Sequence, residues 1–321
     1  MRNPTIVGTG PVDKVAVDLL RPFGEIVTAP DSSEAALLPL LSDAIALVVR
    51  GDGIANARVL EAAPHLKVIG RTGIGYNNVD VAGATARGIP VVYTPGAGSR
   101  AVAEGSLSMM LALCKNLFYW DEQLKSGNWQ SRYVCKPRDM NGATLGIIGL
   151  GSIGQELAKL VCPFGMEVLA YDPYVSPSTA RDLAVEIVAL DDLMTESHFV
   201  SIHAPLTDET RGLINARRLN LLKDGAYLVN MARGQLVESL DLLYDALVSG
   251  KLAGVGLDVF DPEPPNVNHP IFRLQNCITS PHALGMSVGA MFAIFKSMAE
   301  DMAAVLSGMR PRFVVNPEVL S

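Results

Sequence analysis

Three ionisable side chains in the second half of the chain have the types needed to move a proton and to hold an anion. Arg233, Glu263 and His282 each follow a short strand-like apolar run. Histidine exchanges protons near neutral pH, and a carboxylate bonded to its second ring nitrogen would fix the ring and favour the imidazolium. Arginine can grip a carboxylate with two parallel hydrogen bonds and polarise the adjacent carbonyl. The set predicts acid–base chemistry on a small molecule that carries a carboxylate.

A glycine-rich segment supplies the second chemical signal. A short apolar run, residues 145–148, leads into Gly149, Gly151 and Gly154. In this pattern the first glycine permits a tight turn, the second lets the backbone approach a pyrophosphate, and the third lets the next helix pack closely on the sheet. Free N–H groups at the start of that helix would face the phosphates. The spacing predicts a dinucleotide site, with an ordinary structural turn as the alternative.

Asp172 indicates which dinucleotide would bind. It stands at the end of a second apolar run, residues 168–171, downstream of the glycines. A carboxylate there can accept hydrogen bonds from both ribose hydroxyls, whereas it repels a 2'-phosphate. No lysine or arginine follows directly, because residues 173–175 are Pro-Tyr-Val. The sequence therefore favours NAD over NADP, and a solvated loop acid is the alternative reading of Asp172.

Composition narrows the class of protein. Of 321 residues, 49% are apolar, yet no run of hydrophobic residues is long enough to span a membrane, so we expect two soluble domains. The 26 basic and 33 acidic side chains give a net charge of -7, which argues against a nucleic-acid surface. The N-terminus lacks a secretion signal pattern. Scattered cysteines predict reduced thiols in the cytoplasm and no metal site. They are Cys114, Cys135, Cys162 and Cys277.

Short β-rich runs alternate with helix-like stretches along the chain, a pattern typical of parallel sheets. One set of runs lies within the first hundred residues and a second set follows it. We therefore expect two doubly wound α/β domains. The expected strands are residues 5–7, 25–28, 46–49, 67–69 and 90–94 in the first set, and 145–148, 167–171, 199–202, 226–230, 255–259 and 277–279 in the second.

Two long apolar stretches are predicted as helices. One runs uninterrupted over residues 102–119 between the domains, and the other covers residues 288–306 and leads into a β-like tail. We expect this second helix and the tail to return to the first domain. The outer, substrate-binding domain would then be discontinuous and flavodoxin-like, at 1–100 and 289–321, around a Rossmann-like NAD domain at 101–288. Ligands of open α/β sheets bind beyond the carboxyl ends of the strands, so the expected site is a cleft between the domains.

Several longer motifs resemble, in the same order, those of the D-isomer-specific 2-hydroxyacid dehydrogenases, which include phosphoglycerate dehydrogenases and glyoxylate or hydroxypyruvate reductases. They are residues 71–75, 200–215, 230–234, 256–264 and 280–282, so the resemblance covers nearly the whole chain. It implies hydride transfer between NAD and a small D-2-hydroxy acid or 2-keto acid. It also implies that Arg233 binds the substrate carboxylate and carbonyl, that His282 is the acid/base, and that Glu263 is its partner.

The same resemblance implies further contacts. Asp258 would hold the nicotinamide carboxamide. Backbone amides at four positions of the outer domain would receive the substrate carboxylate, namely Arg50, Gly51, Ile74 and Gly75. The other positions that would contact or enclose the cofactor are Ser152, Ile153, His203, Ala204, Pro205, Met231, Ala232 and Gly285. Members of the family are usually homodimers, through an arm that would fall at residues 118–140 and include Trp129.

Three positions depart from the family pattern and leave the substrate open. Asn77 stands where Asp is common, Gly98 where Asn is frequent, and Leu284 where a smaller residue is frequent. Two other readings of the scaffold are a dehydrogenase of phosphite or a similar oxyanion, and an NAD-sensing protein without turnover, as in the co-repressor branch. Formate oxidation is disfavoured because that branch has Gln where this chain has Glu263. Feedback by serine is not expected either, since no regulatory segment follows the outer domain.

Overall fold

The computed structural model describes residues 4–134 and 136–320; residues 1–3 and 321, at the ends of the expected outer domain, and Cys135 lie outside the described residues. The chain forms two compact units, unit 1 with Met1–Gly98 and Met286–Ser321, and unit 2 with Ser99–Gly285. The boundaries expected after residues 100 and 288 therefore lie two and three residues later than those of the units. Over the described residues, the helices are too short or too polar to cross a membrane.

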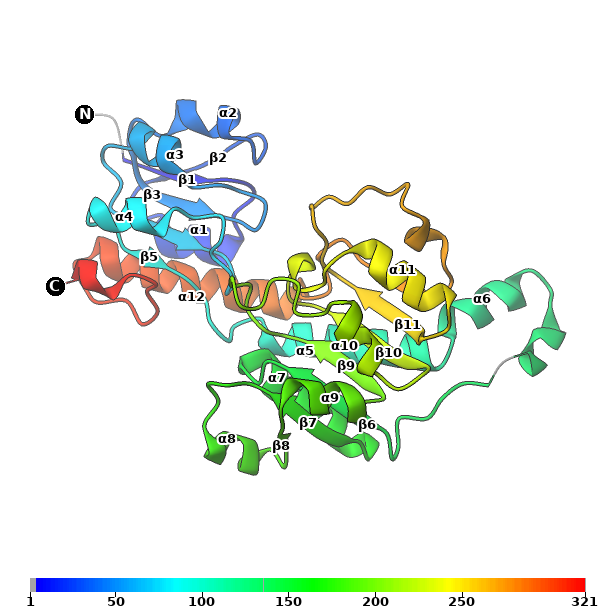
Figure 1. The fold of residues 1–321 in the computed structure, drawn as a ribbon. Helices are drawn as coiled ribbons and strands as arrows, with labels where there is room; N and C mark the ends of the chain where they lie inside the picture. The colour runs from blue at the N-terminus through cyan, green and yellow to red at the C-terminus, as the bar shows by residue number, and fades with distance from the viewer. Residues whose placement is uncertain (1–3, 135, 321) are drawn as a thin grey trace. The chain divides into compact units, whose positions relative to one another are not determined.

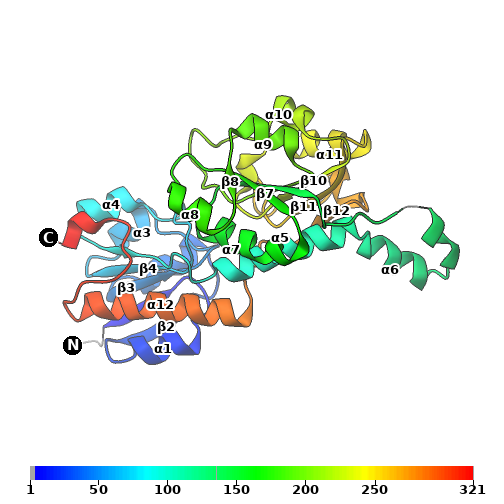
Figure 2. The same ribbon diagram turned by 90° about the horizontal axis from the view of Figure 1, so that it is seen from below.

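Unit 1 is built on a parallel sheet of five strands in the order β2-β1-β3-β4-β5, which is the flavodoxin-like order (Figure 1). Helices α1 and α12 lie side by side on one face of this sheet, and α3 and α4 lie on the other (Figure 2). The strands are β1 (Thr5–Gly8), β2 (Glu25–Thr28), β3 (Ala44–Val49), β4 (Val68–Arg71) and β5 (Val91–Val92). The helices are α1 (Lys14–Leu20), α2 (Glu34–Leu37), η1 (Leu38–Leu40), α3 (Ala57–Ala62), α4 (Val81–Ala86), α12 (Val288–Leu306) and η6 (Pro317–Leu320).

Strand alternation gives unit 1 two apolar layers. Neighbouring residues of a strand point to opposite faces, so Ile6 packs in the cluster that contains Met298 of α12, and Val7 packs in the cluster under α2–α4. The C-terminal tail then joins the edge of the same sheet. Val314 forms an antiparallel bridge with Val92, so the expected β-like tail is a single bridge and not a full strand. Unit 1 is thus made from both ends of the chain.

Unit 2 contains a parallel sheet of seven strands in the order β12-β11-β10-β9-β6-β7-β8. The chain enters at β6 and turns back between β6 and β9, which is the Rossmann arrangement. The strands are β6 (Thr144–Ile148), β7 (Glu167–Tyr171), β8 (Glu186–Ile187), β9 (Phe199–Ile202), β10 (Ala226–Asn230), β11 (Leu252–Leu257) and β12 (Cys277–Thr279). The helices are α5 (Ser99–Cys114), α6 (Leu117–Lys125), η2 (Trp129–Tyr133), α7 (Ser152–Val161), η3 (Cys162–Phe164), α8 (Pro177–Asp182), α9 (Leu190–Glu196), α10 (Ala216–Leu221), η4 (Gly234–Leu236), α11 (Leu240–Val248) and η5 (Pro270–Arg273).

Two expectations about unit 2 were wrong in detail. The helix expected over residues 102–119 is interrupted: α5 ends at Cys114, and α6 begins at Leu117 after Asn116. Asn116 has a φ of 52°, in the left-handed region that asparagine tolerates better than most residues, and this turns the chain. The short edge strand β8 was not foreseen. It has only two residues and pairs with β7 alone among the described strands, so its sequence shows no alternation of apolar and polar side chains.

Candidate active site

The glycine-rich turn between β6 and α7 leaves no room for side chains on one side and is open on the other. Gly149 has a φ of 95°, and a Cβ added there would lie 2.7 Å from the backbone nitrogen of Ala204. A Cβ on Gly154 would collide with the carbonyl oxygen of Gly149. A Cβ on Gly151, by contrast, would meet nothing within 4 Å. The turn is therefore a backbone cradle beside open space at the start of α7, which begins with the predicted residues Ser152 and Ile153 and is suited to a pyrophosphate.

Asp172 lies at the end of β7 and faces this cradle. Its Oδ2 accepts a hydrogen bond of 2.8 Å from the Leu150 N–H inside the glycine turn. Its Oδ1 accepts from the N–H groups of Tyr174, at 2.9 Å, and Val175, at 3.2 Å. An ionised carboxylate has about four acceptor sites, so capacity remains for ribose hydroxyls. The acid thus couples the shape of the phosphate turn to the position where the ribose of a dinucleotide would lie.

His203 follows β9, the strand next to β6, and its backbone closes the far side of the cradle. Its N–H donates to the Ile148 carbonyl at 2.7 Å, and its Nε2 lies 2.8 Å from Ser201 Oγ. The Nδ1 atom is buried and has no partner among residues 4–134 and 136–320. Burial lowers the pKa of His203 to about 3, so the ring is neutral at physiological pH. Ala204 and Pro205 continue this wall as half-buried and exposed residues.

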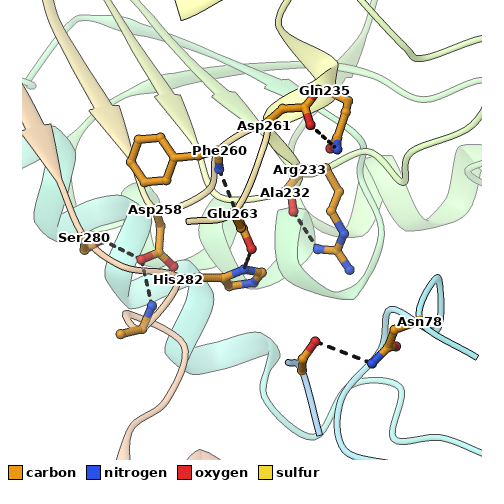
Figure 3. Close-up of polar contacts among 12 residues, drawn as sticks. Asn78, Ala232, Arg233, Gln235, Asp258, Phe260, Asp261, Glu263, Ser280 and His282 are labelled. Carbon is orange, nitrogen blue, oxygen red and sulfur yellow. Dashed lines mark hydrogen bonds and ion pairs between the residues drawn. The ribbon is translucent and has the colours of Figure 1, made fainter. Parts of the chain in front are cut away.

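The three candidate catalytic side chains follow three adjacent strands of unit 2 (Figure 3). His282 Nδ1 lies 2.9 Å from Glu263 Oε2, and Glu263 Oε1 accepts a hydrogen bond of 3.0 Å from the Phe260 N–H. Burial by itself would raise the pKa of Glu263, but these two hydrogen bonds and the charge of Arg233 outweigh it and lower that pKa. The structure therefore brings Glu263 and His282 into direct contact, with Arg233 close enough to act on the same carboxylate.

Arg233 is held by its own turn. Its Nη1 donates to the Ala232 carbonyl at 2.6 Å, while Nε and Nη2 have no hydrogen-bond partner within the described part of the chain. Burial lowers the pKa of Arg233 and the nearby Glu263 opposes that shift, so the guanidinium stays charged. A Cβ on Gly234 would collide with the Phe260 carbonyl, so only glycine fits after the arginine. The free edge of the guanidinium can thus bind an anion.

Sequence reasoning missed the residue that shapes this turn. Asn230, at the end of β10, is 1% exposed. Its Nδ2 donates to the Arg233 carbonyl at 2.9 Å, and its Oδ1 accepts from the Ala232 N–H at 3.0 Å. A polar residue at the end of an apolar strand and three positions before a candidate arginine is the signal that could have found it. Met231, in the same turn, is buried.

Asp258 anchors the turn that carries His282. The carboxylate is 3% exposed, and its Oδ1 accepts from Ser280 Oγ at 2.5 Å and from the Ala283 N–H at 2.9 Å. These bonds bracket His282, whose φ of 54° is unusual for a residue with a side chain. Gly285 closes the turn, and a Cβ there would lie 2.8 Å from Val102 Cγ2. Asp258 therefore fixes the backbone of the candidate acid/base.

Unit 1 holds the backbone amides expected to receive a carboxylate, and they are not equivalent. The Arg50 N–H already donates to Thr9 Oγ1 at 3.0 Å. Within residues 4–134 and 136–320, the N–H groups of Gly51, Ile74 and Gly75 make no hydrogen bond, and Ile74 and Gly51 are exposed. The available donors in unit 1 are thus three of the four expected amides. No group of three or more potential ligands in the described residues could hold a metal ion.

The sequence of unit 2 matches a known family. Residues 107–283 match the model of the D-isomer specific 2-hydroxyacid dehydrogenase NAD binding domain. A hydroxypyruvate reductase from Thermotoga maritima is 42% identical over 275 residues, which is 85% of this chain and 88% of that protein. A D-3-phosphoglycerate dehydrogenase from Archaeoglobus fulgidus is 37% identical over 95% of this chain, but the chain spans only 58% of that relative's length.

The fold agrees with the sequence comparison. A D-lactate dehydrogenase from Aquifex aeolicus, solved with NAD and lactic acid, superposes with a TM-score of 0.88 at 28% identity and covers 97% of this chain and 99% of its own. The glycine cradle and Asp172 fit the nucleotide expected of such a domain. The chain belongs to the D-isomer specific 2-hydroxyacid dehydrogenase family, and residues 107–283 form its NAD-binding domain.

Proposed function

We propose that this protein is an NAD-dependent oxidoreductase that interconverts a small D-2-hydroxy acid and the corresponding 2-keto acid, with reduction of glyoxylate or hydroxypyruvate as the expected assay. The observation that carries the proposal is the 2.9 Å contact between His282 and Glu263 beside the charged Arg233, whose Nε and Nη2 have no partner among the described residues. These are the groups required to protonate a carbonyl oxygen and to hold the neighbouring carboxylate.

His282 handles the proton in this proposal. The lowered pKa of Glu263 keeps its carboxylate ionised, and an ionised carboxylate can only accept a hydrogen bond. The hydrogen between the two residues therefore belongs to Nδ1 of His282. Nε2 is left to donate a proton to the carbonyl oxygen in reduction, or to take one from the hydroxyl in oxidation. Glu263 stabilises the imidazolium and fixes the plane of the ring.

Arg233 and unit 1 hold the substrate. The free edge of the guanidinium binds the carboxylate and polarises the adjacent carbonyl at C2. The amides of Gly51, Ile74 and Gly75 are the proposed further donors to the carboxylate, while the Arg50 amide stays with Thr9. This set of donors supports a 2-keto acid as the substrate class.

The glycine cradle, Asp172 and Asp258 would hold the cofactor. When bound, NAD supplies the hydride that C2 gains in reduction, or accepts it in oxidation. The N–H groups at the start of α7 would bind the pyrophosphate, and Asp172 would accept hydrogen bonds from the ribose hydroxyls. Asp258 would accept a hydrogen bond from the carboxamide, and it already holds the His282 turn through Ser280 and Ala283. The remaining proposed cofactor contacts are Ser152, Ile153, His203, Ala204, Pro205, Met231, Ala232 and Gly285.

We also propose a cytoplasmic homodimer. Cys114, Cys162 and Cys277 are free thiols, which suits a reducing compartment, and burial raises the pKa of Cys277 to about 12. The segment α6–η2 exposes large apolar side chains to a degree that is unusual on a free surface. Their exposed fractions are 56% for Phe118, 60% for Leu124, 58% for Trp129 and 74% for Tyr133. A second copy of the chain is the proposed cover of this arm.

The test is a panel of 2-keto acids with NADH, followed by the loss of NADH absorbance. Glyoxylate or hydroxypyruvate should be turned over by the wild-type protein. His282→Ala should bind NADH as tightly as the wild type and lose about a hundredfold to ten-thousandfold in kcat/KM. Wild-type kcat/KM in this variant would refute the mechanism. NADH binding without turnover of any acid would favour the NAD-sensing alternative, and faster oxidation of phosphite than of any hydroxy acid would favour the oxyanion alternative.

A further inference from the structure

One asparagine of unit 1 donates hydrogen bonds to the backbone carbonyls of a neighbouring turn. Asn78, in the loop after β4, points its side-chain amide at the turn of residues 50–53, which follows β3 (Figure 3). Its Nδ2 donates to the Arg50 carbonyl at 2.8 Å and to the Gly53 carbonyl at 2.6 Å, and the Gly51 carbonyl lies 3.4 Å away. The two short bonds use both hydrogens of the amide.

The oxygen of this amide lies on the side of Arg71. Arg71 Nε donates to Asn78 Oδ1 at 3.5 Å, so the oxygen faces the arginine and the nitrogen faces the turn. The backbone carbonyl of Asn78 also accepts from the Ala55 N–H at 2.9 Å. Asn78 is therefore attached to the segment 50–55 through both its side chain and its main chain.

The contacts of Asn78 with these carbonyls also determine where the N–H groups of the turn point. In a trans peptide the N–H points opposite to the carbonyl of the preceding residue. The carbonyls of Arg50 and Gly51 face Asn78, so the N–H groups of Gly51 and Asp52 point to the opposite side. Within residues 4–134 and 136–320 neither of these two N–H groups has a hydrogen-bond partner, and both residues are exposed. Successive N–H groups aimed one way form an anion-binding concavity.

Thr9 and Gly53 hold the rest of this turn. A Cβ on Gly53 would collide with Thr9 Oγ1, the same oxygen that accepts the Arg50 N–H. The Gly53 N–H donates back to the Arg50 carbonyl at 3.2 Å. Thr9 therefore holds the first amide of the turn, and Asn78 holds the carbonyls. Gly51 and Asp52 are the amides left for a ligand.

We propose that Asn78 is a positioning residue of the substrate carboxylate site, which presents the N–H groups of Gly51 and Asp52 by holding the carbonyls of their turn. This inference rests on the proposed function, since the anion is the carboxylate of the 2-keto acid. Asn78 itself does not touch the substrate. Its removal leaves the cofactor domain intact and relaxes the turn.

The test compares Asn78→Ala and Asn78→Asp with a matched control, Asn316→Ala. Asn316 also bridges three groups of unit 1, because its Oδ1 accepts from the Val91 N–H and its Nδ2 donates to Thr85 Oγ1 and the Ile89 carbonyl. The Asn316 side chain contacts the chain at the start of β5, whereas Asn78 contacts the turn that follows the end of β3. Asn316→Ala should lower the melting temperature without loosening the turn at residues 50–53.

We expect KM for the keto acid to rise about tenfold in Asn78→Ala, because misplaced donors lose a carboxylate contact. Asn78→Asp, although isosteric, should raise it further, since a carboxylate would face two carbonyl oxygens and could donate to neither. The dissociation constant of NADH should stay within about twofold in both variants. Amide hydrogen exchange of Arg50 and Gly53, the two hydrogen-bonded amides of the turn, should become faster. Asn316→Ala should leave KM and this exchange unchanged.

Unchanged KM and unchanged exchange in both Asn78 variants would overturn the inference, as would an equal rise of KM in Asn316→Ala. These outcomes differ from failure of the proposed function. In that case the wild-type protein itself turns over no keto acid, and the inference falls with it. Faster exchange without a change in KM would show that the turn relaxes but does not bind the substrate, which also overturns the proposal.

Discussion

His282 Nδ1 lies 2.9 Å from Glu263 Oε2, and this contact joins the loops that follow two paired strands, β11 and β12. The loop at Glu263 is further fixed by the Phe260 N–H, and the turn at His282 is fixed by Asp258. The imidazole is 49% exposed and the carboxylate 40% exposed, so the pair remains accessible to a small molecule. Its electrostatics lead to the first two predictions.

Replacing Glu263 by glutamine should change the pH profile of keto-acid reduction. The lowered pKa of Glu263 keeps the wild-type carboxylate ionised across the neutral range, where it stabilises the protonated imidazole that reduction requires. Glutamine can still accept from Nδ1 but carries no charge. In the wild type, kcat for reduction should fall in acid as Glu263 becomes protonated, and this acid limb should be missing from the profile of Glu263→Gln. A profile that coincides with that of the wild type would contradict the proposed role of Glu263.

The same substitution gives a test on stability. A carboxylate whose pKa is lowered by folding stabilises the folded state above its unfolded pKa, which is about 4.3 for glutamate. That contribution disappears as the pH falls through the lower folded value. The stability difference between wild type and Glu263→Gln, from urea unfolding, should thus be constant at neutral pH and shrink in acid. A difference that grows on acidification would contradict the sign of this shift.

Arg233→Lys should lose substrate binding although the formal charge is kept. Lysine cannot make two parallel hydrogen bonds to a carboxylate, and burial would lower its pKa in this site. We expect kcat/KM for the keto acid to fall by about tenfold to a hundredfold, as for loss of a charged hydrogen bond. Arg217→Lys is the matched control, because Arg217 is exposed and pairs with Asp191 on the surface. Equal kinetics of both variants would exclude Arg233 from substrate binding.

Asp172→Asn should weaken the preference for NADH. The amide can still accept a hydrogen bond from the Leu150 N–H, so the glycine turn keeps a partner, but the charge that repels a 2'-phosphate is gone. The ratio of kcat/KM for NADH to that for NADPH should fall about tenfold. Asp182→Ala, an exposed acid at the end of α8, serves as the control. A wild-type preference for NADPH would overturn the assignment of Asp172.

Charge on the arm should separate the proposed dimer. Leu124→Asp and Trp129→Asp, made together, place two charges among exposed apolar side chains, and sedimentation should then report a monomer where the wild type is a dimer. The control is Val248→Asp on α11, because Val248 is 62% exposed but lies outside the arm. A wild-type monomer would refute the dimer, and a dimer that persists in the double variant would place the interface elsewhere.

Local signals in the sequence predicted the glycine turn, Asp172 and, among the described residues, every strand except β8, although some expected bounds, such as those of β5 and β11, were wrong by one to three residues. The first and last residues of β7, β9, β10 and β12 coincide with those of the expected apolar runs, because buried parallel strands are continuous hydrophobic stretches in the sequence. The turn at Gly149 was likewise predictable, because a left-handed φ beside a close backbone neighbour demands glycine. The types of Arg233, Glu263 and His282 and their place after strand-like runs were also visible in the sequence.

Tertiary structure alone decided which of these groups touch. The 2.9 Å bond from His282 to Glu263 depends on β12 pairing with β11, and no local pattern encodes a strand's neighbour. Asn78 was missed for the same reason, since it acts by meeting the carbonyls of a turn that only folding brings near. Asn230 differs, because it bonds within its own turn and its place at the end of an apolar strand was a local signal. The elements and the chemistry they carry could thus be predicted from short stretches of sequence, because propensity and periodicity act over a few residues. The structure decided the contacts, because hydrogen-bond partners are set by non-local packing.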